Sequence, residues 1–290
     1  MKKKILLTGS KGFILSSFYD RYKNDYEIIR TGRNNKNLVD LDVTDEAQVN
    51  HVLKQYKPDI VLHGAGITST GGCENNKTLA YDVNVNGSIN VAKACNSIGA
   101  RMVFFSTEQV FNGNEERGPY TEVDEPIPNT YYGETKLAAE NQIKSILEDY
   151  VIMRLTWMYG FSKDSRVKNI LTDTIFSKED IQVPDNEFRG MSPIETLLDV
   201  FPKIMDLPKG IYHIGSENNE SRYAIVKEIL EMINRNDIHP MINNHDHVRD
   251  IRLDMAKVNQ LGIVFDETSK AIKKTILKNK NKIDELIKND

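Results

Sequence analysis

The segment ILLTGSKGFIL, residues 5–15, decides the fold. A short apolar run leads into two glycines, and an apolar segment with helical spacing follows them. Glycine in such a turn lets the backbone approach a pyrophosphate closely, and the positive end of the helix dipole attracts the same group. We therefore expect a strand, a phosphate-binding turn and a helix, with cofactor contacts from Gly9, Gly12, Phe13 and Ile14.

Position 15 departs from the usual spacing of such a turn. A third glycine would fall there, and this chain has Leu15. That glycine normally allows the helix to pack closely on the strand. We expect Leu15 to shift the first helix while the phosphate site is retained.

Apolar runs alternate with amphipathic segments beyond this turn. Strands are expected at 3–8, 26–31, 59–64, 101–107 and 150–156, and helices at 12–22, 45–56, 76–98 and 131–148. Continuous apolar strands separated by helices are typical of a parallel sheet that is covered on both faces. The fold class is therefore α/β, with a Rossmann-type doubly wound parallel sheet.

The pattern changes after about residue 160. A strand at 180–184, a helix at 193–205, a strand at 210–215, a helix at 221–235 and a lysine-rich helix from about 267 are expected. This arrangement predicts a cofactor domain over 1–160. A smaller C-terminal α/β lobe that binds the substrate would follow over 161–290, with some chain crossing between the two.

Composition excludes several classes of function. The net charge of -4, from 42 acidic and 38 basic residues, provides no general attraction for nucleic acid. No apolar stretch approaches the roughly 20 residues of a membrane span, and the apolar run after MKKK is too short for a signal peptide. We expect a cytoplasmic protein without a membrane partner. No metal site is expected, because neither the cysteines (Cys73, Cys95) nor the histidines of 239–247 have the spacing of metal ligands.

The end of the second strand bears on the choice of cofactor. The segment IIRTGRNN carries Arg30 and Arg33 and no acidic residue at its tip. An acid there would bind the ribose hydroxyls of NAD, whereas an arginine can pair with a 2′-phosphate. Arg33 therefore favours NADP(H) over NAD(H), although a solvated loop arginine would look the same. Other expected cofactor contacts are Asp42 and Val43 beside the adenine, and Ala65 and Gly66 beside the dinucleotide backbone.

A tyrosine and a lysine in YYGETK, residues 131–136, carry the expected chemistry. Tyr132 and Lys136 are four residues apart and share one helix face, whereas Tyr131 is five residues from the lysine. An ammonium beside a phenol stabilises the phenolate, which lets a tyrosine transfer a proton near neutral pH. Thr107, at the end of the fourth long strand, would hold the substrate carbonyl. The pair alone could arise by chance, and its position after the glycine turn gives it weight.

Three large side chains in the second half are candidates for substrate binding. Trp157 could stack on a sugar or nucleobase, although a core tryptophan is the simpler interpretation. Arg189 and Arg249 could pair with a diphosphate or could form ordinary surface ion pairs.

Together these motifs resemble a known family. The glycine turn, DVNVNGSINVAKA, FFSTEQVFNG, YYGETKLAAE and MRLTWMYG are similar to those of the extended short-chain dehydrogenase/reductases. The segments FRGMSPIETLLDVFPKI and VRDIRLDMAKVNQLGI resemble the sugar-nucleotide-binding lobe of the dTDP-4-dehydrorhamnose reductase branch. The resemblance implies NADPH-dependent reduction of a nucleotide-linked 4-keto-6-deoxy sugar in deoxysugar and polysaccharide biosynthesis. It also implies catalysis by Thr107, Tyr132 and Lys136, a supporting role for Asn84, and a possible homodimer.

The residues after the threonine depart from the pattern of this branch. Asp-Tyr is usual there, and this chain has Glu108 and Gln109. Contacts of Glu108 and Val110 with the sugar would differ accordingly. A dehydratase would need two acidic residues at this place, and only Glu108 is acidic here, which argues against dehydration. Two alternatives to a reductase remain. One is a sugar-nucleotide epimerase, and the other is a regulatory protein on the same fold, such as the regulatory subunit of methionine adenosyltransferase.

Overall fold

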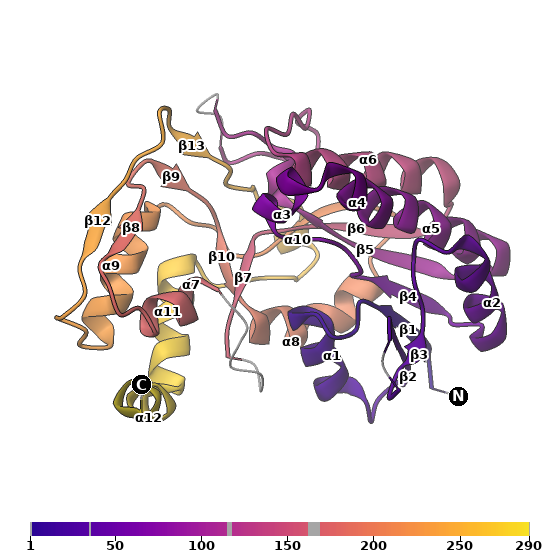
Figure 1. Cartoon of the computed structure of the whole chain (residues 1–290), viewed down its shortest axis with the longest axis horizontal. Coiled ribbons are helices and arrows are strands. Elements are labelled where there is room, and N and C mark those ends of the chain that lie inside the picture. The colour runs from indigo at the N-terminus through magenta and orange to yellow at the C-terminus, as the bar shows by residue number, and fades with distance from the viewer. Residues whose placement is uncertain (1, 35, 115–117, 162–168, 290) are drawn as a thin grey trace. The chain divides into compact units, whose positions relative to one another are not determined.

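A computed structural model describes residues 2–34, 36–114, 118–161 and 169–289 of the chain (Figure 1). The chain forms two compact units. The first contains Met1–Phe111, Glu125–Arg154 and Phe201–Tyr212, and the second contains Asn112–Asp124, Leu155–Val200 and His213–Asp290. The sequence predicts a boundary near residue 160 with some chain crossing. In the structure, Asn112–Asp124 belong to the second unit and Phe201–Tyr212 belong to the first.

A seven-stranded parallel sheet forms the centre of the first unit. Its order is β11-β6-β5-β4-β1-β2-β3. The strands are β1 (Lys4–Thr8), β2 (Glu27–Gly32), β3 (Val39–Asp40), β4 (Ile60–His63), β5 (Arg101–Thr107), β6 (Tyr150–Leu155) and β11 (Gly210–Ile214). Strand β1 pairs in parallel with both β2 and β4. The chain therefore reverses its direction of strand addition beside β1, which is the ligand-binding position in doubly wound sheets. The predicted fold class is confirmed.

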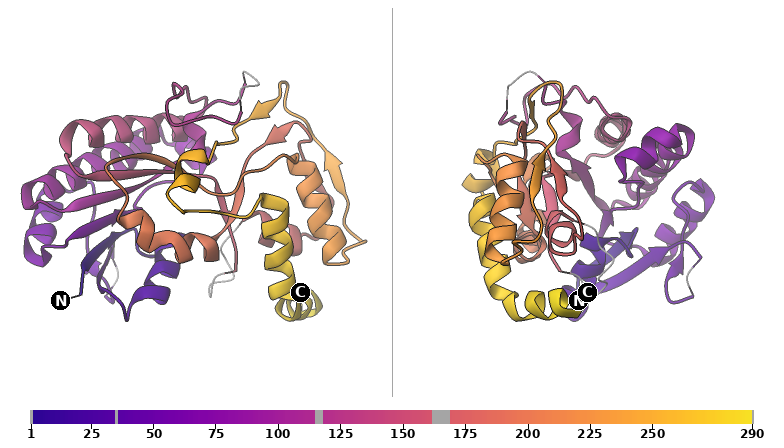
Figure 2. Two further views of the ribbon diagram at one scale, coloured as in Figure 1. Left: turned by 180° about the vertical axis from the view of Figure 1, so that it is seen from behind. Right: turned by 60° about the vertical axis from the view of Figure 1, so that its left-hand side comes forward.

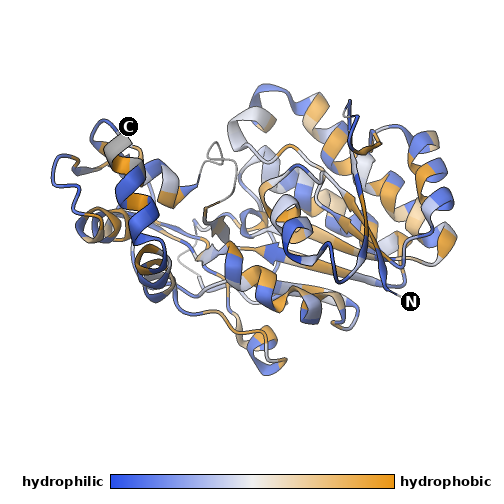
Figure 3. Ribbon diagram, turned by 90° about the horizontal axis from the view of Figure 1, so that it is seen from below, coloured by the Kyte–Doolittle hydropathy of each residue, from blue (hydrophilic) through white to orange (hydrophobic). Residues whose placement is uncertain are grey.

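Helices cover both faces of this sheet. They are α1 (Phe13–Tyr22), α2 (Glu46–Tyr56), α5 (Gly87–Ile98), α6 (Tyr131–Ile146) and the second half of α8 (Ile194–Met205). The short helices α3 (Thr70–Asn75) and α4 (Lys77–Tyr81) follow β4 and pack against α6. Apolar side chains of α2, α5 and α6 pack on one face of the sheet. On the other face, the ring centroid of Phe201 in α8 lies 4.9 Å from that of Phe18 and 6.0 Å from that of Phe105. Figure 2 shows this layering, and Figure 3 shows the apolar character of the central strands.

The helix expected over 76–98 is interrupted. Asn76 caps α4, and a π-helical turn, η1 (Asp82–Asn86), joins α4 to α5. A π turn adds one residue to the helical repeat and is frequent at functional sites. It rotates the side chains that precede it relative to those of α5.

Among its described residues, the second unit contains three short parallel strand pairs. These join β7 (Trp157–Tyr159) to β10 (Met191–Pro193), β8 (Ile181–Val183) to β12 (Pro240–Ile242), and β9 (Glu187–Phe188) to β13 (Arg249–Asp250). Its helices are α7 (Ile170–Ile175), the first half of α8, α9 (Arg222–Met232), α10 (Ala256–Gln260), α11 (Thr268–Lys278) and α12 (Lys280–Asn289). Isoleucine and leucine side chains of α7, α9 and α11 form much of its core.

Candidate active site

The glycine turn approaches the end of β4 closely. Gly9 has a φ of +69°, and a Cβ placed on it would lie 2.7 Å from the Ala65 nitrogen and 2.8 Å from the Gly64 oxygen. The Gly12 amide donates to the Gly9 carbonyl at 2.9 Å. Phe13 and Ile14 then open α1, so their amides belong to the helix terminus that lacks internal acceptors. These features fit a dinucleotide phosphate.

Leu15 packs against the glycine of the neighbouring strand end. Its side chain is buried, and a Cβ added to Gly64 would lie 2.8 Å from its Cδ1 atom. Gly64 thus provides the space that the leucine occupies in place of the third glycine. With Leu15 at this position, the hydrogen bond between Gly12 and Gly9 in the glycine turn is still present.

Gly9→Ala is expected to weaken dinucleotide binding at least tenfold and to destabilise the fold. The positive φ alone costs an alanine about 1–2 kcal/mol, and its Cβ would also meet backbone atoms that cannot turn aside. Fluorescence titration with NADPH and thermal unfolding measure the two effects. Gly71→Ala is the control, since nothing lies within 4 Å of its added Cβ and it stands in α3. Equal behaviour of the two variants would contradict the role of Gly9.

The tip of β2 has an acidic neighbour that the sequence pattern did not reveal. Strand β3 pairs with β2, and the Arg33 guanidinium lies 3.5 Å from the Asp42 carboxylate. Burial alone would raise the pKa of Asp42, but hydrogen bonds from Thr44 and the charge of Arg33 outweigh it and lower that pKa. Arg30 lies over the Tyr19 ring at 4.3 Å and donates to the Ser10 carbonyl of the glycine turn at 3.4 Å. Two guanidinium groups therefore accompany the carboxylate at this strand end.

The remaining expected cofactor residues lie at strand ends of the same sheet. Val43 is buried, and its carbonyl accepts from the Asn90 side chain at 3.0 Å. The Ala65 amide donates to the Thr8 hydroxyl at 3.3 Å. A Cβ on Gly66 would lie 3.1 Å from the Asn84 Oδ1 atom, so this glycine permits the close approach of Asn84.

Asn84 lies inside the π turn and links two segments. Its side chain accepts from the Ile67 amide at 2.7 Å and donates to the Ile67 carbonyl at 3.0 Å. It also donates to the Thr135 hydroxyl at 3.0 Å, and Thr135 donates to the Tyr132 carbonyl at 2.8 Å. Asn84 thereby fixes the loop after β4 against the first turn of α6.

Tyr132 and Lys136 are both buried on α6, one turn apart. The helix begins after Thr130, whose hydroxyl accepts from the Gly133 amide at 3.1 Å. Thr107 is buried at the end of β5, and its hydroxyl oxygen accepts from the Gln109 amide at 3.2 Å. Accepting that bond uses a lone pair, so the hydroxyl proton can still donate to a carbonyl.

The Lys136 ammonium is buried against an aromatic ring. Its Nζ atom lies 4.0 Å from the centroid of the Phe104 ring. Burial lowers the pKa of Lys136 to about 7, against the opposing effect of the Glu140 charge. Ammonium and amine forms are therefore both populated near neutral pH.

A buried network beside these residues was not expected from the sequence. Arg154 forms a two-pronged ion pair with Glu140, with Nη2 to Oε2 at 2.8 Å and Nε to Oε1 at 3.1 Å. The Ser106 hydroxyl donates to Glu140 at 2.5 Å. Because Ser106 precedes Thr107 and Glu140 follows Lys136 by one turn, this network joins β5, β6 and α6. An arginine inside the apolar run YVIMRL was the available signal of a buried partner.

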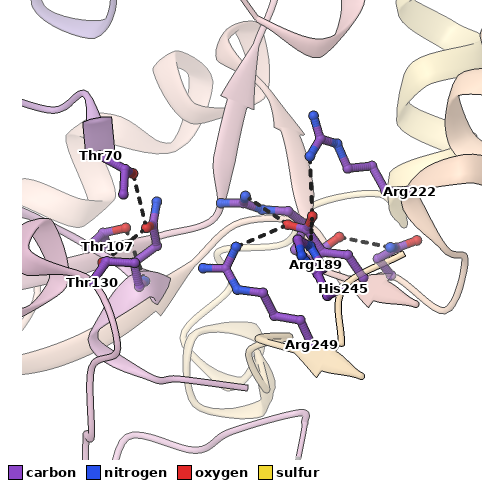
Figure 4. Close-up of polar contacts among 10 residues, drawn as sticks. Thr70, Thr107, Thr130, Arg189, Arg222, His245 and Arg249 are labelled. Atoms are coloured by element: carbon purple, nitrogen blue, oxygen red, sulfur yellow. Dashed lines mark hydrogen bonds and ion pairs between the residues drawn. The ribbon is translucent and has the colours of Figure 1, made fainter. Parts of the chain in front are cut away.

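The segment after Thr107 forms a short 3₁₀ helix, η2 (Glu108–Val110), with Glu108 and Val110 buried. The Gln109 side-chain oxygen accepts from Thr70 at 3.5 Å and from Thr130 at 3.4 Å. Figure 4 shows these two threonines together with Thr107. Gln109 thus bridges the starts of α3 and α6. Sugar contacts from Glu108 and Val110 stay a prediction.

The second unit gathers cationic side chains around one carboxylate. Glu187 Oε1 lies 3.3 Å from Arg189 and 3.6 Å from Arg249, and Oε2 lies 3.2 Å from Arg222 and 3.3 Å from His245. Figure 4 shows the three arginines and His245 converging. We refer to these five residues as the Glu187 cluster. Three guanidinium groups face one carboxylate, so the cluster carries a net positive charge.

Electrostatics and an aromatic ring organise this cluster. Burial alone would raise the pKa of Glu187, but the charges of the three arginines and the hydrogen bond with His245 outweigh it and lower that pKa to about 2. The Arg189 and Arg222 guanidinium carbons lie 4.7 Å and 5.1 Å from the centroid of the Trp157 ring. Trp157 therefore orients two arginines by cation–π contact. Arg222 was not among the expected site residues, since it stands alone at a helix start.

The parallel sheet with its glycine turn and the Tyr-x-x-x-Lys helix define an extended short-chain dehydrogenase/reductase. The family model described as RmlD substrate binding domain matches residues 2–285, and the chain belongs to that family. It is 31% identical to the spore coat polysaccharide biosynthesis protein SpsK of Bacillus subtilis over 229 residues, which cover 79% of this chain and 78% of SpsK.

Solved structures have the same fold. The dTDP-4-dehydrorhamnose reductase ortholog of Clostridium acetobutylicum has a TM-score of 0.83 at 28% identity, over 94% of this chain and 98% of that one. The dTDP-4-dehydrorhamnose reductase of Bacillus anthracis, solved in complex with NADP, has a TM-score of 0.81 at 24% identity, over 96% of this chain and 99% of that one.

Two further observations concern the described residues. Among them, no group of three or more histidine, cysteine, aspartate or glutamate side chains is arranged to hold a metal ion. Within the same ranges, no helix has the length and apolar character to cross a membrane.

Proposed function

We propose that this protein is an NADPH-dependent reductase of a nucleotide-linked 4-keto-6-deoxy sugar. The observation that carries the proposal is the burial of Tyr132 and Lys136 one turn apart on α6, with Thr107 buried at the end of β5. Membership of a family with reductase relatives supports the same reaction class.

The chain's own residues supply the proton side of this reaction. Thr107 donates a hydrogen bond to the keto oxygen and holds it for reduction. When bound, NADPH supplies the hydride for the carbonyl carbon. Tyr132 donates its phenolic proton to the alkoxide that forms, and the ammonium form of Lys136 stabilises the resulting phenolate. The burial of these side chains limits competing contact with water.

NADP(H) is the proposed cofactor, with NAD(H) less favoured. Arg33 and Arg30 accompany the end of β2, where a 2′-phosphate would pair with a guanidinium. Asp42, which pairs with Arg33, would otherwise favour ribose hydroxyls. The arginines outnumber this carboxylate, so the preference follows from the balance of charge.

The Glu187 cluster is the proposed binding element for the substrate's diphosphate. Its guanidinium groups pair well with phosphate oxygens, and its net charge attracts an anion. Trp157 holds two of these arginines in place, and stacking of its half-buried ring on a base or sugar stays a prediction.

Arg249→Gln is expected to raise the dissociation constant of dTDP by about 10- to 100-fold, because a charged hydrogen bond contributes about 1.5–3 kcal/mol. Isothermal calorimetry at two salt concentrations measures the affinity and its ionic component. Lys273→Gln is the control, since it removes one charge from a pair between an exposed lysine and the half-buried Glu228 in the same unit. An affinity equal to that of the control would remove Arg249 from the diphosphate site.

The proposed function is tested with purified protein, NADPH and a dTDP-linked 4-keto-6-deoxy sugar. Stoichiometric oxidation of NADPH, with formation of the 4-hydroxy sugar nucleotide, is the expected result. Conversion of a sugar nucleotide without net consumption of the cofactor would identify an epimerase instead. Binding of NADPH without turnover on any keto sugar nucleotide would leave the regulatory alternative.

A further inference from the structure

His63 is a buried histidine at the end of β4 that the proposed reaction does not use. Its Nδ1 atom lies 2.7 Å from the Thr8 hydroxyl oxygen, and its Nε2 atom lies 3.0 Å from the Ser88 hydroxyl oxygen. The ring also stacks on Phe104, at 5.8 Å between centroids. Both ring nitrogens are therefore engaged, and each partner belongs to a different element.

The hydrogen bonds around His63 have a defined direction. The Ser88 hydroxyl donates its proton to the Asn84 carbonyl at 2.6 Å, so it accepts from His63 Nε2–H. His63 Nδ1 then accepts from the Thr8 hydroxyl. Burial, together with the charge of Lys136, lowers the pKa of His63 to about 3, which keeps the ring neutral. A neutral ring with one N–H is the form that this chain of bonds requires.

The series of hydrogen bonds around His63 begins at the glycine turn. Thr8 is the last residue of β1 and precedes Gly9 directly. Its hydroxyl oxygen accepts from the Ala65 amide, whose nitrogen is the atom nearest to a Cβ placed on Gly9. Thr8 and His63 thus hold the turn against the end of β4.

The same series of hydrogen bonds ends at α6, the helix that carries Tyr132. Ser88 holds the carbonyl of Asn84 in the π turn, and the Asn84 side chain holds the Thr135 hydroxyl. Thr135 in turn donates to the carbonyl of Tyr132. The bonds are continuous from the glycine turn to the first turn of α6, and every side chain between the two ends is buried.

We propose that His63 is a positioning residue that couples the glycine turn to Asn84 and Tyr132 through Thr8 and Ser88. Binding of the dinucleotide at the turn and placement of the proton donor are then linked. This inference rests on the proposed function in one respect, which is that NADPH is the ligand of the turn.

The test is a double-mutant cycle on Thr8 and Ser88, which bond to different ring nitrogens of His63. Dissociation constants for NADPH are measured by fluorescence titration for wild type, Thr8→Val, Ser88→Ala and the double variant. Ser88→Ala is expected to weaken NADPH binding about 2- to 10-fold, the effect of one buried hydrogen bond, although Ser88 lies at the far side of His63. The double variant is expected to bind no more weakly than Thr8→Val, because the link is already broken.

Ser97→Ala is the matched control. Ser97 stands on the same helix, α5, and its hydroxyl also donates to a backbone carbonyl of the preceding turn, at 2.8 Å from Ala94. It should leave NADPH affinity unchanged and add independently to Thr8→Val. If Ser88→Ala lowers the melting temperature but binds NADPH as wild type does, His63 has a structural role and the coupling is wrong. If Thr8→Val does not fold, the comparison of Ser88→Ala with Ser97→Ala still decides the coupling.

The double-mutant cycle measures NADPH binding alone, so it tests the coupling independently of whether the protein is a reductase. Wild type that binds NADPH and reduces no keto sugar nucleotide would overturn the proposed function, and the cycle would still decide the coupling. Wild type that binds neither NADPH nor NADH would overturn both.

Discussion

Tyr132→Phe is expected to reduce the rate of keto-sugar reduction by about 10²- to 10⁴-fold, the usual contribution of a positioned proton donor. The change removes one oxygen atom and keeps the ring, which packs against Cys73 and Ala80. Fold and NADPH affinity should therefore stay near those of wild type. Single-turnover oxidation of NADPH with a saturating keto sugar nucleotide measures the chemical step directly.

Tyr131→Phe is the matched control for this experiment. Tyr131 is the neighbouring residue on α6, and the Lys77 Nζ atom lies 4.9 Å from the centroid of its ring. Its variant should reduce the substrate at the wild-type rate. Undiminished turnover by Tyr132→Phe would show that another group donates the proton, whereas loss in both variants would indicate damage to the start of α6.

Glu140→Leu is expected to lower the free energy of unfolding by about 3–5 kcal/mol, the usual cost of leaving a buried charge without its partner. Arg154 is 2% exposed and Glu140 is fully buried, so water cannot replace the lost carboxylate. Urea unfolding followed by circular dichroism measures the change. Glu148→Gln is the control. The Glu148 side chain is 97% exposed, so its ion pair with Lys209 should contribute less than about 1 kcal/mol to the free energy of unfolding.

The double variant Glu140→Leu with Arg154→Met separates charge from packing. Replacing both members removes the unpaired charge, so the double variant should be more stable than Glu140→Leu alone. A double variant as unstable as the sum of the two single variants would show that the ion pair itself is not the source of the loss.

Local patterns determined the central part of the fold. The apolar runs that became β1, β4, β5 and β6 are long enough, and apolar enough on both faces, to predict a parallel sheet. The glycine turn and the Tyr132–Lys136 spacing could likewise be predicted, because a turn and a helix face depend on residues close together in the chain.

Short elements escaped this kind of prediction. Strands β3, β9 and β13 have two residues each. A strand of that length has too few side chains to show a period, and its pairing depends on a partner far away in the chain. For the same reason, the carboxylate of Asp42 beside Arg33 was not expected from the β2 sequence.

The sequence by itself determined the class of fold, the glycine turn and the pair on α6. The tertiary structure decided which distant polar groups meet: Arg222 and Arg249 at Glu187, Arg154 at Glu140, and His63 between Thr8 and Ser88. The physical reason is that periodicity and turn chemistry act over a few residues. The partner of a buried charge or ring nitrogen is instead selected by packing, across separations of 14 to 62 residues in these cases.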